Sequence, residues 1–154
     1  MSRFRTVTTY GVRQRVACYV TRTTEAGEEL LVFDHRDDEP DNPSGTQIPA
    51  GGMLRFEAIV DAAAREVEEE TGIADTTYVR QVGFVELGLD DPGGPSMTTY
   101  VHVTTPLDGP DAWDHTVGGD GEDGGMVFLC RWAPLPLGFE LAGGQGQFLD
   151  ALTG

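Results

Sequence analysis

The sequence contains no lysine, and its ten arginines stand against 26 aspartates and glutamates, so the formal net charge is −16 over 154 residues. Binding to a nucleic-acid polymer requires a basic surface that neutralises phosphates, and attachment to an anionic membrane requires positive charge as well. The composition therefore argues against both partners. If the substrate is nevertheless a phosphate compound, cations have to bridge two negatively charged partners.

Long apolar runs are also missing. No run approaches the roughly 18 residues that cross a bilayer, and residues 1–12 lack the apolar stretch of a signal peptide. Cysteine is scarce: Cys18 and Cys130 lie far apart, each inside an apolar run. We expect two buried free thiols, with a structural disulfide as the alternative, in a soluble cytoplasmic protein.

The length of 154 residues and a hydrophobic content of 39% suit one domain with a real core. No repeat or linker divides the chain, so we expect a single domain over residues 1–154, in which residues 1–10 form either an edge strand or a frayed tail. The expected order along the chain is several strands, one helix, further strands and a terminal amphipathic turn. This order favours a mixed sheet between helices. The expected strands are 13–22 (half-buried), 29–35, 46–49, 76–89, 97–105, 114–117 and 126–135.

An acidic helix follows residues 51–56. Glu66, Glu69 and Glu70 are spaced i, i+3 and i+4, which places them within one sector of the helix surface, whereas Glu68 points away from that sector. Three crowded like charges repel one another, and a divalent cation with a preference for oxygen ligands would remove that repulsion. A separate apolar stripe should pack on the core; it consists of Val60, Ala63, Ala64 and Val67.

The residues around this helix mark its ends. Gly51 and Gly52 allow a tight turn that brings the backbone close to a ligand or metal. The negative charge of Asp61 is favourable near the positive end of the helix dipole, although no good N-cap residue precedes the helix. Gly72 occupies the position of a left-handed C-terminal cap.

These residues together resemble the Nudix box. All of its fixed positions are matched, namely by Gly51, Glu57, Arg65, Glu66, Val67, Glu69, Glu70, Gly72 and Ile73. The resemblance implies an α/β/α sandwich with a mixed sheet, and a hydrolase that cleaves a pyrophosphate bond in a nucleoside diphosphate linked to another group. It also implies one to three Mg2+ or Mn2+ ions as cofactors. Family members are often dimers, which leaves a homodimer open.

The resemblance further implies roles within the box. Glu66 and Glu70 would be metal ligands, and Glu69 either a further ligand or the residue that takes a proton from water. Arg65 would hold carboxylates in place, as the outer partners of metal ligands do. Glu57 would either ligate a metal or pair with Arg65.

Family members often add a carboxylate from a later loop. The candidates in the segment 118–125 are Asp120, Glu122 and Asp123, of which we favour Glu122 because of its reach. Glu86 is the alternative outside this segment.

Two further residues are candidates for substrate binding together with Gly51 and Gly52. Arg36 could grip a distal phosphate or form a surface ion pair with a neighbouring aspartate. Trp113, which we expect in a loop, could stack on a base or pack in the core.

Taken with the resemblance to the Nudix box, the sequence predicts a metal-dependent hydrolase acting on the pyrophosphate bond of a small nucleotide-like substrate. One alternative is a non-catalytic module of the same fold that binds a nucleotide for regulation. Another is an isoprenoid diphosphate isomerase, which would require Cys18 or Cys130 in the site. The sequence does not specify the substrate.

Overall fold

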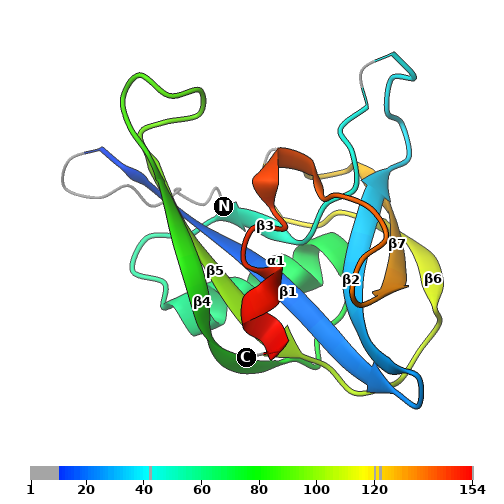
Figure 1. The fold of residues 1–154 in the computed structure, drawn as a ribbon. Helices are drawn as coiled ribbons and strands as arrows, with labels where there is room; N and C mark the ends of the chain where they lie inside the picture. The colour runs from blue at the N-terminus through cyan, green and yellow to red at the C-terminus, as the bar shows by residue number, and fades with distance from the viewer. Residues whose placement is uncertain (1–10, 42, 120, 122, 154) are drawn as a thin grey trace.

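The computed structural model describes residues 11–41, 43–119, 121 and 123–153. These residues form a seven-stranded mixed sheet with the order β4-β5-β1-β2-β7-β6, and β3 pairs with β1 (Figure 1). The elements are β1 (Arg13–Thr24), β2 (Gly27–His35), β3 (Ala50–Gly52), α1 (Ile59–Thr71), β4 (Thr77–Leu87), β5 (Ser96–Thr104), β6 (Ala112–Thr116), β7 (Val127–Pro134) and the 3-10 helices η1 (Ala142–Gly144) and η2 (Leu149–Thr153). β1 and β5 run parallel, whereas β1 is antiparallel to both β2 and β3. The predicted mixed sheet is confirmed, while the prediction for residues 1–10 lies outside the described residues.

β1 is covered on both faces. Val16 and Cys18 pack in the core on the α1 side, and Ala17 and Tyr19 pack in a second core on the other side. The prediction of a half-buried strand is therefore wrong. Polar residues of the strand are buried as well, since the Thr21 hydroxyl forms a hydrogen bond of 2.7 Å with His102.

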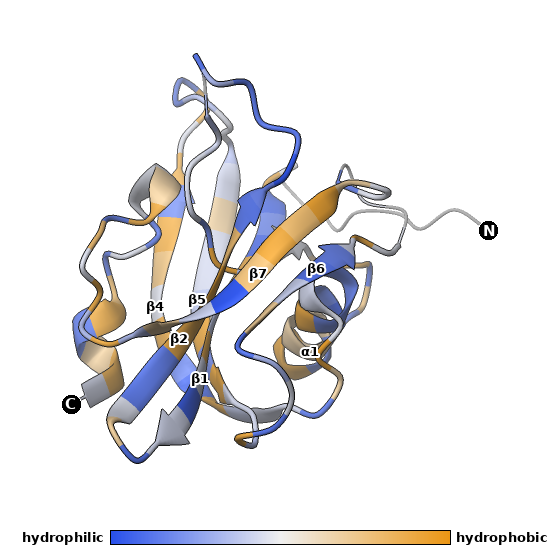
Figure 2. Cartoon of the chain, turned by 90° about the vertical axis from the view of Figure 1, so that its right-hand side faces the viewer, coloured by the Kyte–Doolittle hydropathy of each residue, from blue (hydrophilic) through white to orange (hydrophobic). Residues whose placement is uncertain are grey.

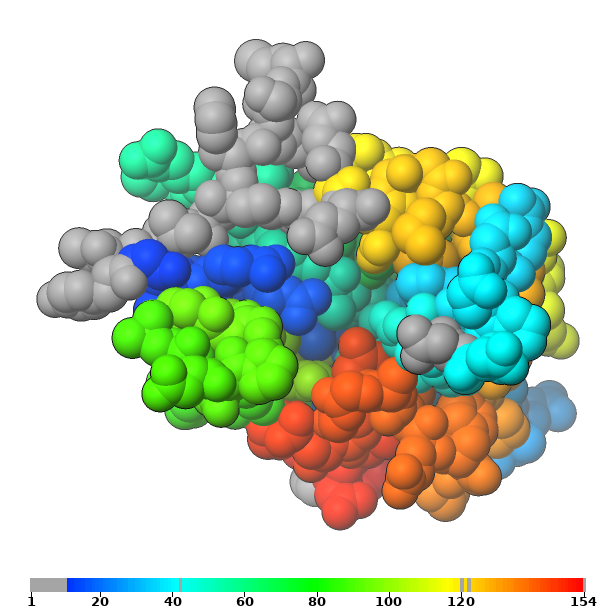
Figure 3. All heavy atoms as spheres, turned by 90° about the horizontal axis from the view of Figure 1, so that it is seen from above, coloured from blue at the N-terminus to red at the C-terminus, as the bar shows by residue number. Residues whose placement is uncertain are grey.

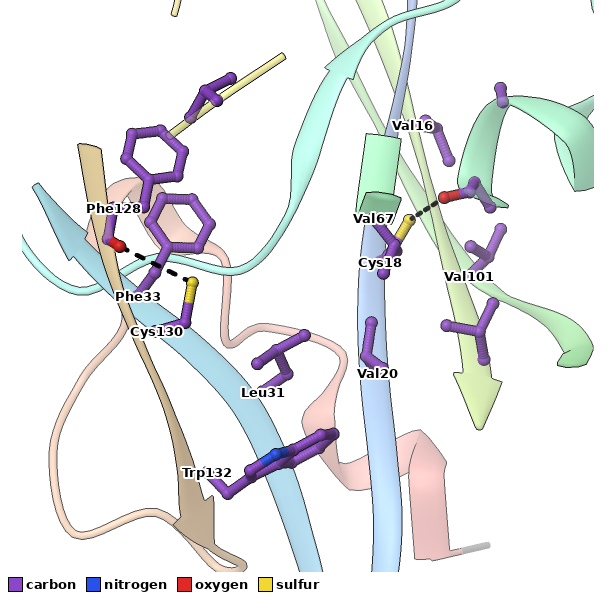
Figure 4. Packing of buried hydrophobic residues seen from close by; sticks show 14 residues of the cluster. Val16, Cys18, Val20, Leu31, Phe33, Val67, Val101, Phe128, Cys130 and Trp132 are labelled. Carbon is purple, nitrogen blue, oxygen red and sulfur yellow. Dashed lines mark hydrogen bonds between the residues drawn. The ribbon is translucent and has the colours of Figure 1, made fainter. Parts of the chain in front are cut away.

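The first layer over the sheet is α1 with its core, shown in Figure 4. Phe33 of β2 and Phe128 of β7 stack with ring centroids 4.1 Å apart. Both cysteines are buried in this core as free thiols, and the Cys18 thiol donates to the carbonyl of Ala63. The predicted free thiols are thus confirmed.

The C-terminal segment forms the second layer, on the opposite side of the sheet from α1 (Figure 2). Phe148 packs against Tyr100 at a centroid distance of 5.0 Å, and Leu149 and Leu152 pack on the same core. Tyr19 ties the segment to β1, because its hydroxyl donates to the Gln145 carbonyl and accepts from the Phe148 N–H. The fold is an α/β/α sandwich in which 3-10 helices make the second layer.

α1 ends as predicted but faces the core differently. Gly72 adopts a left-handed conformation (φ 82°), and its N–H bonds to the Glu68 carbonyl. The predicted apolar stripe is wrong at two positions, since Val60 is 46% exposed and Ala64 is exposed. The helix is turned so that Glu66 and Glu70 are buried alongside its apolar residues; the buried set is Ala62, Ala63, Glu66, Val67, Glu70 and Thr71.

The remaining strands follow the predictions with two corrections. β4 and β5 form the predicted antiparallel pair, with an irregular register between Gln81 and Gly83. Residues 46–49 do not form a regular strand, because Gln47 makes a single bridge to Phe33. The predicted strand 114–117 begins earlier, as β6, and includes Trp113.

The contact between Gly83 and the C-terminal layer yields a stability prediction. A Cβ at Gly83 would lie 2.4 Å from the Phe148 ring, so Gly83→Ala must displace that ring. We expect it to lower the free energy of unfolding by about 1–3 kcal/mol, as measured by urea denaturation. Gly138→Ala is the matched control, because a Cβ there meets nothing within 4 Å. Equal midpoints for both variants would contradict the packing of Phe148 on β4.

Candidate active site

A cavity of about 490 Å³ lies where β1, β3, α1 and the segment after β6 meet. Its lining combines box residues with two arginines of β1 and is made of Arg13, Arg15, Ala50, Gly51, Gly52, Glu66, Glu69, Glu70, Val117, Gly118, Gly121, Asp123 and Gly124. The structure therefore brings together all three glutamates predicted to bind metal. Glu68, which was predicted to point away, is exposed.

Gly51 is required by the position of Glu66. β3 pairs with β1 so that Gly51 lies opposite Val16, and a Cβ on Gly51 would fall 2.3 Å from a carboxylate oxygen of Glu66. A side chain at this position would take the place of that carboxylate. The predicted close approach of the backbone therefore occurs, and its immediate neighbour is a candidate metal ligand.

Arg65 gathers the carboxylates at the helix surface. It forms a two-point ion pair with Glu57 (both N–O distances 2.8 Å) and bonds to Glu66 at 2.8 Å and Glu69 at 3.3 Å. It also donates to the Gly52 carbonyl, which fixes β3 against α1. Partial burial alone would lower the pKa of Arg65, but the hydrogen bonds and charges of Glu57 and Glu66 outweigh it and raise the pKa. In this arrangement Glu57 serves as the partner of Arg65.

Glu70 is a buried carboxylate with few compensating contacts. It is 4% exposed and accepts a hydrogen bond of 2.7 Å from the Ala50 N–H. Burial raises its pKa well above the ordinary value, and the charge of Glu66 raises it further. The charged form is thus unfavourable unless positive charge is supplied.

The glutamates suit a hard divalent cation because they offer carboxylate oxygens in a buried cavity. Among the described residues, no group of three His, Cys, Asp or Glu side chains is already arranged to hold a metal. The hydrogen bonds explain this: Glu66 and Glu69 bond to Arg65, and Glu70 bonds to Ala50. Metal binding would require these carboxylates to exchange those partners for the ion.

The segment after β6 closes over Glu69. The Gly118 N–H donates to the Glu69 carbonyl at 2.9 Å, and a Cβ on Gly119 would lie 2.7 Å from the Glu69 carboxyl carbon. Asp123 lines the cavity from this segment, whereas the favoured candidate Glu122 and also Asp120 lie outside the described residues.

Three sequence candidates lie away from the cavity. Glu86 is exposed on β4 and is not among the lining residues. Arg36 is exposed and bonds to Asp37 at 3.4 Å, which is the surface ion pair that was the alternative to a phosphate contact. Trp113 lies in β6 rather than in a loop, and its indole N–H donates to the Thr71 carbonyl at 2.8 Å. The cysteines required for isomerase chemistry are buried in the core, where burial raises the pKa of both thiols.

The sequence interpretation missed Arg13 and Arg15, which alternate on β1 and line the cavity. Their spacing of two residues would have placed them on one strand face, but only the pairing of β1 with β3 brings that face to the box. Arg15 also lines a neighbouring cavity of about 420 Å³ on the side of the C-terminal layer. Seen from above, this second hollow is bordered by β4 and β5, the segment before β3 and the C-terminal segment (Figure 3). The Arg15 Nε atom is buried and has no hydrogen-bond partner among the described residues.

A family model identifies the class of protein to which this fold and site belong. The model of the NUDIX domain matches residues 12–151, so the chain belongs to the NUDIX domain family. The predicted family membership is confirmed.

Curated relatives include human diphosphoinositol polyphosphate phosphohydrolase 3-alpha, which is 34% identical over 113 residues, or 73% of this chain and 63% of that protein. Mouse diphosphoinositol polyphosphate phosphohydrolase 2 is 32% identical over 73% of this chain and 57% of its own length. The chain thus spans about three fifths of the length of these relatives.

Solved structures share the fold at low identity. A binary complex of the C. elegans Ap4A hydrolase superposes with a TM-score of 0.64 at 17% identity and covers 92% of this chain and 96% of that one. The NUDIX domain of Shewanella oneidensis NrtR complexed with ADP ribose has a TM-score of 0.61 at 16% identity. The match covers 92% of this chain and 86% of that one. Within the described part of the chain, no helix has the length and apolar character needed to traverse a bilayer.

The burial of Glu70 yields a prediction about metal and stability. Without metal, Glu70→Gln should raise the unfolding temperature by roughly a few degrees, because it removes a buried charge and keeps an oxygen for the Ala50 N–H. Mg2+ or Mn2+ should raise the unfolding temperature of the wild type and raise that of Glu70→Gln much less. Differential scanning fluorimetry with and without metal measures both effects. Exposed Glu68→Gln should match the wild type, and a metal response that is unchanged in Glu70→Gln would exclude Glu70 as a ligand.

Proposed function

We propose that this protein is a Mg2+- or Mn2+-dependent hydrolase that cleaves a pyrophosphate bond in a small nucleotide-like substrate. The observation that carries the proposal is the burial of Glu66 and Glu70 side by side in a cavity that also contains Arg13 and Arg15. Such a cavity has ligands for cations and, at its edge, positive charge for phosphate oxygens.

The proposed roles of the glutamates follow from how exposed each side chain is. Glu66, Glu69 and Glu70 would hold the ions, with Asp123 as the described carboxylate nearest to completing the set. A bound divalent ion lowers the pKa of water and polarises a phosphoryl oxygen. Glu69 is the best placed of the three to accept the proton of the attacking water, because its side chain is 14% exposed, against 5% for Glu66, and Glu70 is only 4% exposed. Water then attacks phosphorus, and the bond from phosphorus to the bridging oxygen breaks.

The location of Arg15 indicates where the rest of the substrate would lie. It lines both the acidic cavity and the 420 Å³ cavity beside it, so a diphosphate held at the glutamates would pass this guanidinium. The second cavity is lined by groups that suit an uncharged polar moiety, including Tyr100, Gln145 and Gln147. A sugar or nucleoside matches such a lining.

The charge balance separates two kinds of substrate. The names of the curated relatives specify a diphosphoinositol polyphosphate, whereas those of the solved structures mention Ap4A and ADP ribose. Among the described lining residues, two arginines accompany four carboxylates in the acidic cavity, and Arg15 is the one basic residue of the second cavity. This part of the lining offers few cations for additional phosphates, which favours a substrate with a neutral organic part.

The experiment that tests the proposed function is a substrate panel assayed with Mg2+ and with Mn2+. It should contain nucleoside di- and triphosphates, sugar nucleotides, dinucleoside polyphosphates and a diphosphoinositol polyphosphate. We expect phosphate release from at least one nucleotide compound. Glu69→Gln and Glu70→Gln should each lower kcat by about 100-fold or more, whereas Glu68→Gln, at an exposed position between them, should stay near the wild type.

The panel also discriminates the alternative of a regulatory module. A nucleotide that raises the unfolding temperature but is not hydrolysed under any metal condition would favour that alternative. Full activity of purified Glu70→Gln would instead refute the assignment of the site.

The position of Arg15 yields a separate prediction. Arg15→Gln should raise KM for the preferred substrate roughly tenfold, with a smaller effect on kcat, because it removes a charged contact to phosphate and keeps the three glutamates. Steady-state kinetics with Arg36→Gln serve as the control, since Arg36 is exposed and pairs with Asp37. Equal kinetics of the two variants would place the substrate elsewhere.

A further inference from the structure

A third cavity, of about 470 Å³, lies at the C-terminal end of α1 and is separate from the candidate active site. Its walls come from the end of α1, the segment after β5, and strands β6 and β7. The lining residues are Thr71, Gly72, Ile73, Ala74, Asp75, Thr105, Pro106, Asp108, Gly109, Pro110, Trp113, His115 and Trp132. Of these, none lines the acidic cavity that holds Glu66 and Glu70.

Both tryptophans of the chain line this third cavity. Trp113 pairs with Cys130 in the β6–β7 register, so Trp132, two residues further on, projects from the same face of the sheet. The bond from the Trp113 indole to the Thr71 carbonyl uses the only polar atom of that side chain, and the ring is left as an apolar wall.

Trp132 already carries a cation of the protein itself, so a contact with a ligand falls to Trp113 and not to this face of Trp132. The Arg22 guanidinium lies 4.5 Å from the ring centroid of Trp132 and is held there by Glu29 and Asp111. The face of an indole ring attracts positive charge through its quadrupole, and tryptophan is the strongest of the aromatic side chains in this respect.

The surroundings of the cavity are electronegative. Asp75 and Asp108 line it, and both are exposed. The Asp108 carboxylate accepts from the Gly109 N–H, which keeps it within its own loop. The negative end of the α1 dipole is at Thr71 and Gly72, and the last turn of α1 holds no basic residue. Among the described residues that line the cavity there is no arginine, although the Arg22 guanidinium lies against the ring of Trp132.

We propose that this third cavity binds a small organic cation of the quaternary ammonium class. Aromatic and proline walls suit methyl groups, while the two aspartates and the helix end supply the opposite charge. An anion would be repelled by the same groups. A small hydrated metal ion would make little use of the tryptophan and proline walls, so the combination favours a cation with an apolar surface.

The two tryptophans make the proposal directly measurable, because tryptophan emission reports on the cavity without a label. Choline chloride is the probe, titrated at constant ionic strength against sodium chloride. Its neutral isostere 3,3-dimethylbutan-1-ol is the control for apolar binding. We expect saturable quenching by choline with a Kd of about a millimolar or below, and at least roughly tenfold weaker binding of the isostere.

Variants locate the site. The double substitution Asp75→Asn with Asp108→Asn should weaken choline binding roughly tenfold. Asp150→Asn, at an exposed aspartate of η2 on the other face of the sheet, should not change it. Glu70→Gln should also bind choline like the wild type, because Glu70 is not among the lining residues.

Several results would overturn the proposal. Equal affinity for choline and the isostere would show an apolar cavity without charge selectivity. The absence of a saturable change over the soluble range of choline would show that no such cation binds. Unaltered binding by the double aspartate variant would show that choline binds outside this cavity. Circular dichroism of the variants distinguishes lost binding from lost folding.

Discussion

The burial of two carboxylates on neighbouring turns of one helix is the constraint on which the rest of the structure depends. Glu66 and Glu70 are each 4% exposed, in a chain whose net charge is already −16. Arg65 compensates Glu66 but not Glu70, whose pKa is raised by burial and by its neighbour. Such an arrangement is unfavourable without compensating positive charge, and the proposed metal site rests on this feature.

The local backbone serves the same arrangement. The Glu66 carboxylate occupies the space that a side chain at Gly51 would fill, and the Glu69 carboxylate does the same at Gly119. Arg65 connects the helix to β3 through a hydrogen bond to the Gly52 carbonyl, which joins the acidic surface to the strand beside it. Precision at the candidate site thus comes from glycines and one guanidinium rather than from a rigid loop.

Negative charge is used differently in the two cavities beside the C-terminal half of α1. In the acidic cavity, buried glutamates of the helix lie near Arg13 and Arg15, which suits metal ions and phosphates. In the third cavity, at the end of the helix, exposed aspartates and the helix dipole border tryptophan rings, which suits organic cations. The burial of the carboxylates in one cavity and their exposure in the other account for the difference, because a buried carboxylate demands a direct ligand whereas an exposed one provides a weaker field.

The sequence by itself determined the family, the C-terminal cap at Gly72 and the convergence of Glu66, Glu69 and Glu70, because these depend on periodicity and spacing within one short segment. It also determined the mixed sheet, through the order of strands and helix along the chain. It failed where a long-range contact decides the outcome. The burial of both faces of β1 depends on the C-terminal layer, and the rotation of α1 that exposes Val60 depends on where its glutamates are buried. Arg15 reaches the site only because β1 pairs with β3, and Trp113 leaves the expected loop because β6 extends along β7. Only tertiary structure decides such pairings, since the hydrogen bonds and packing that fix them join residues far apart in the chain.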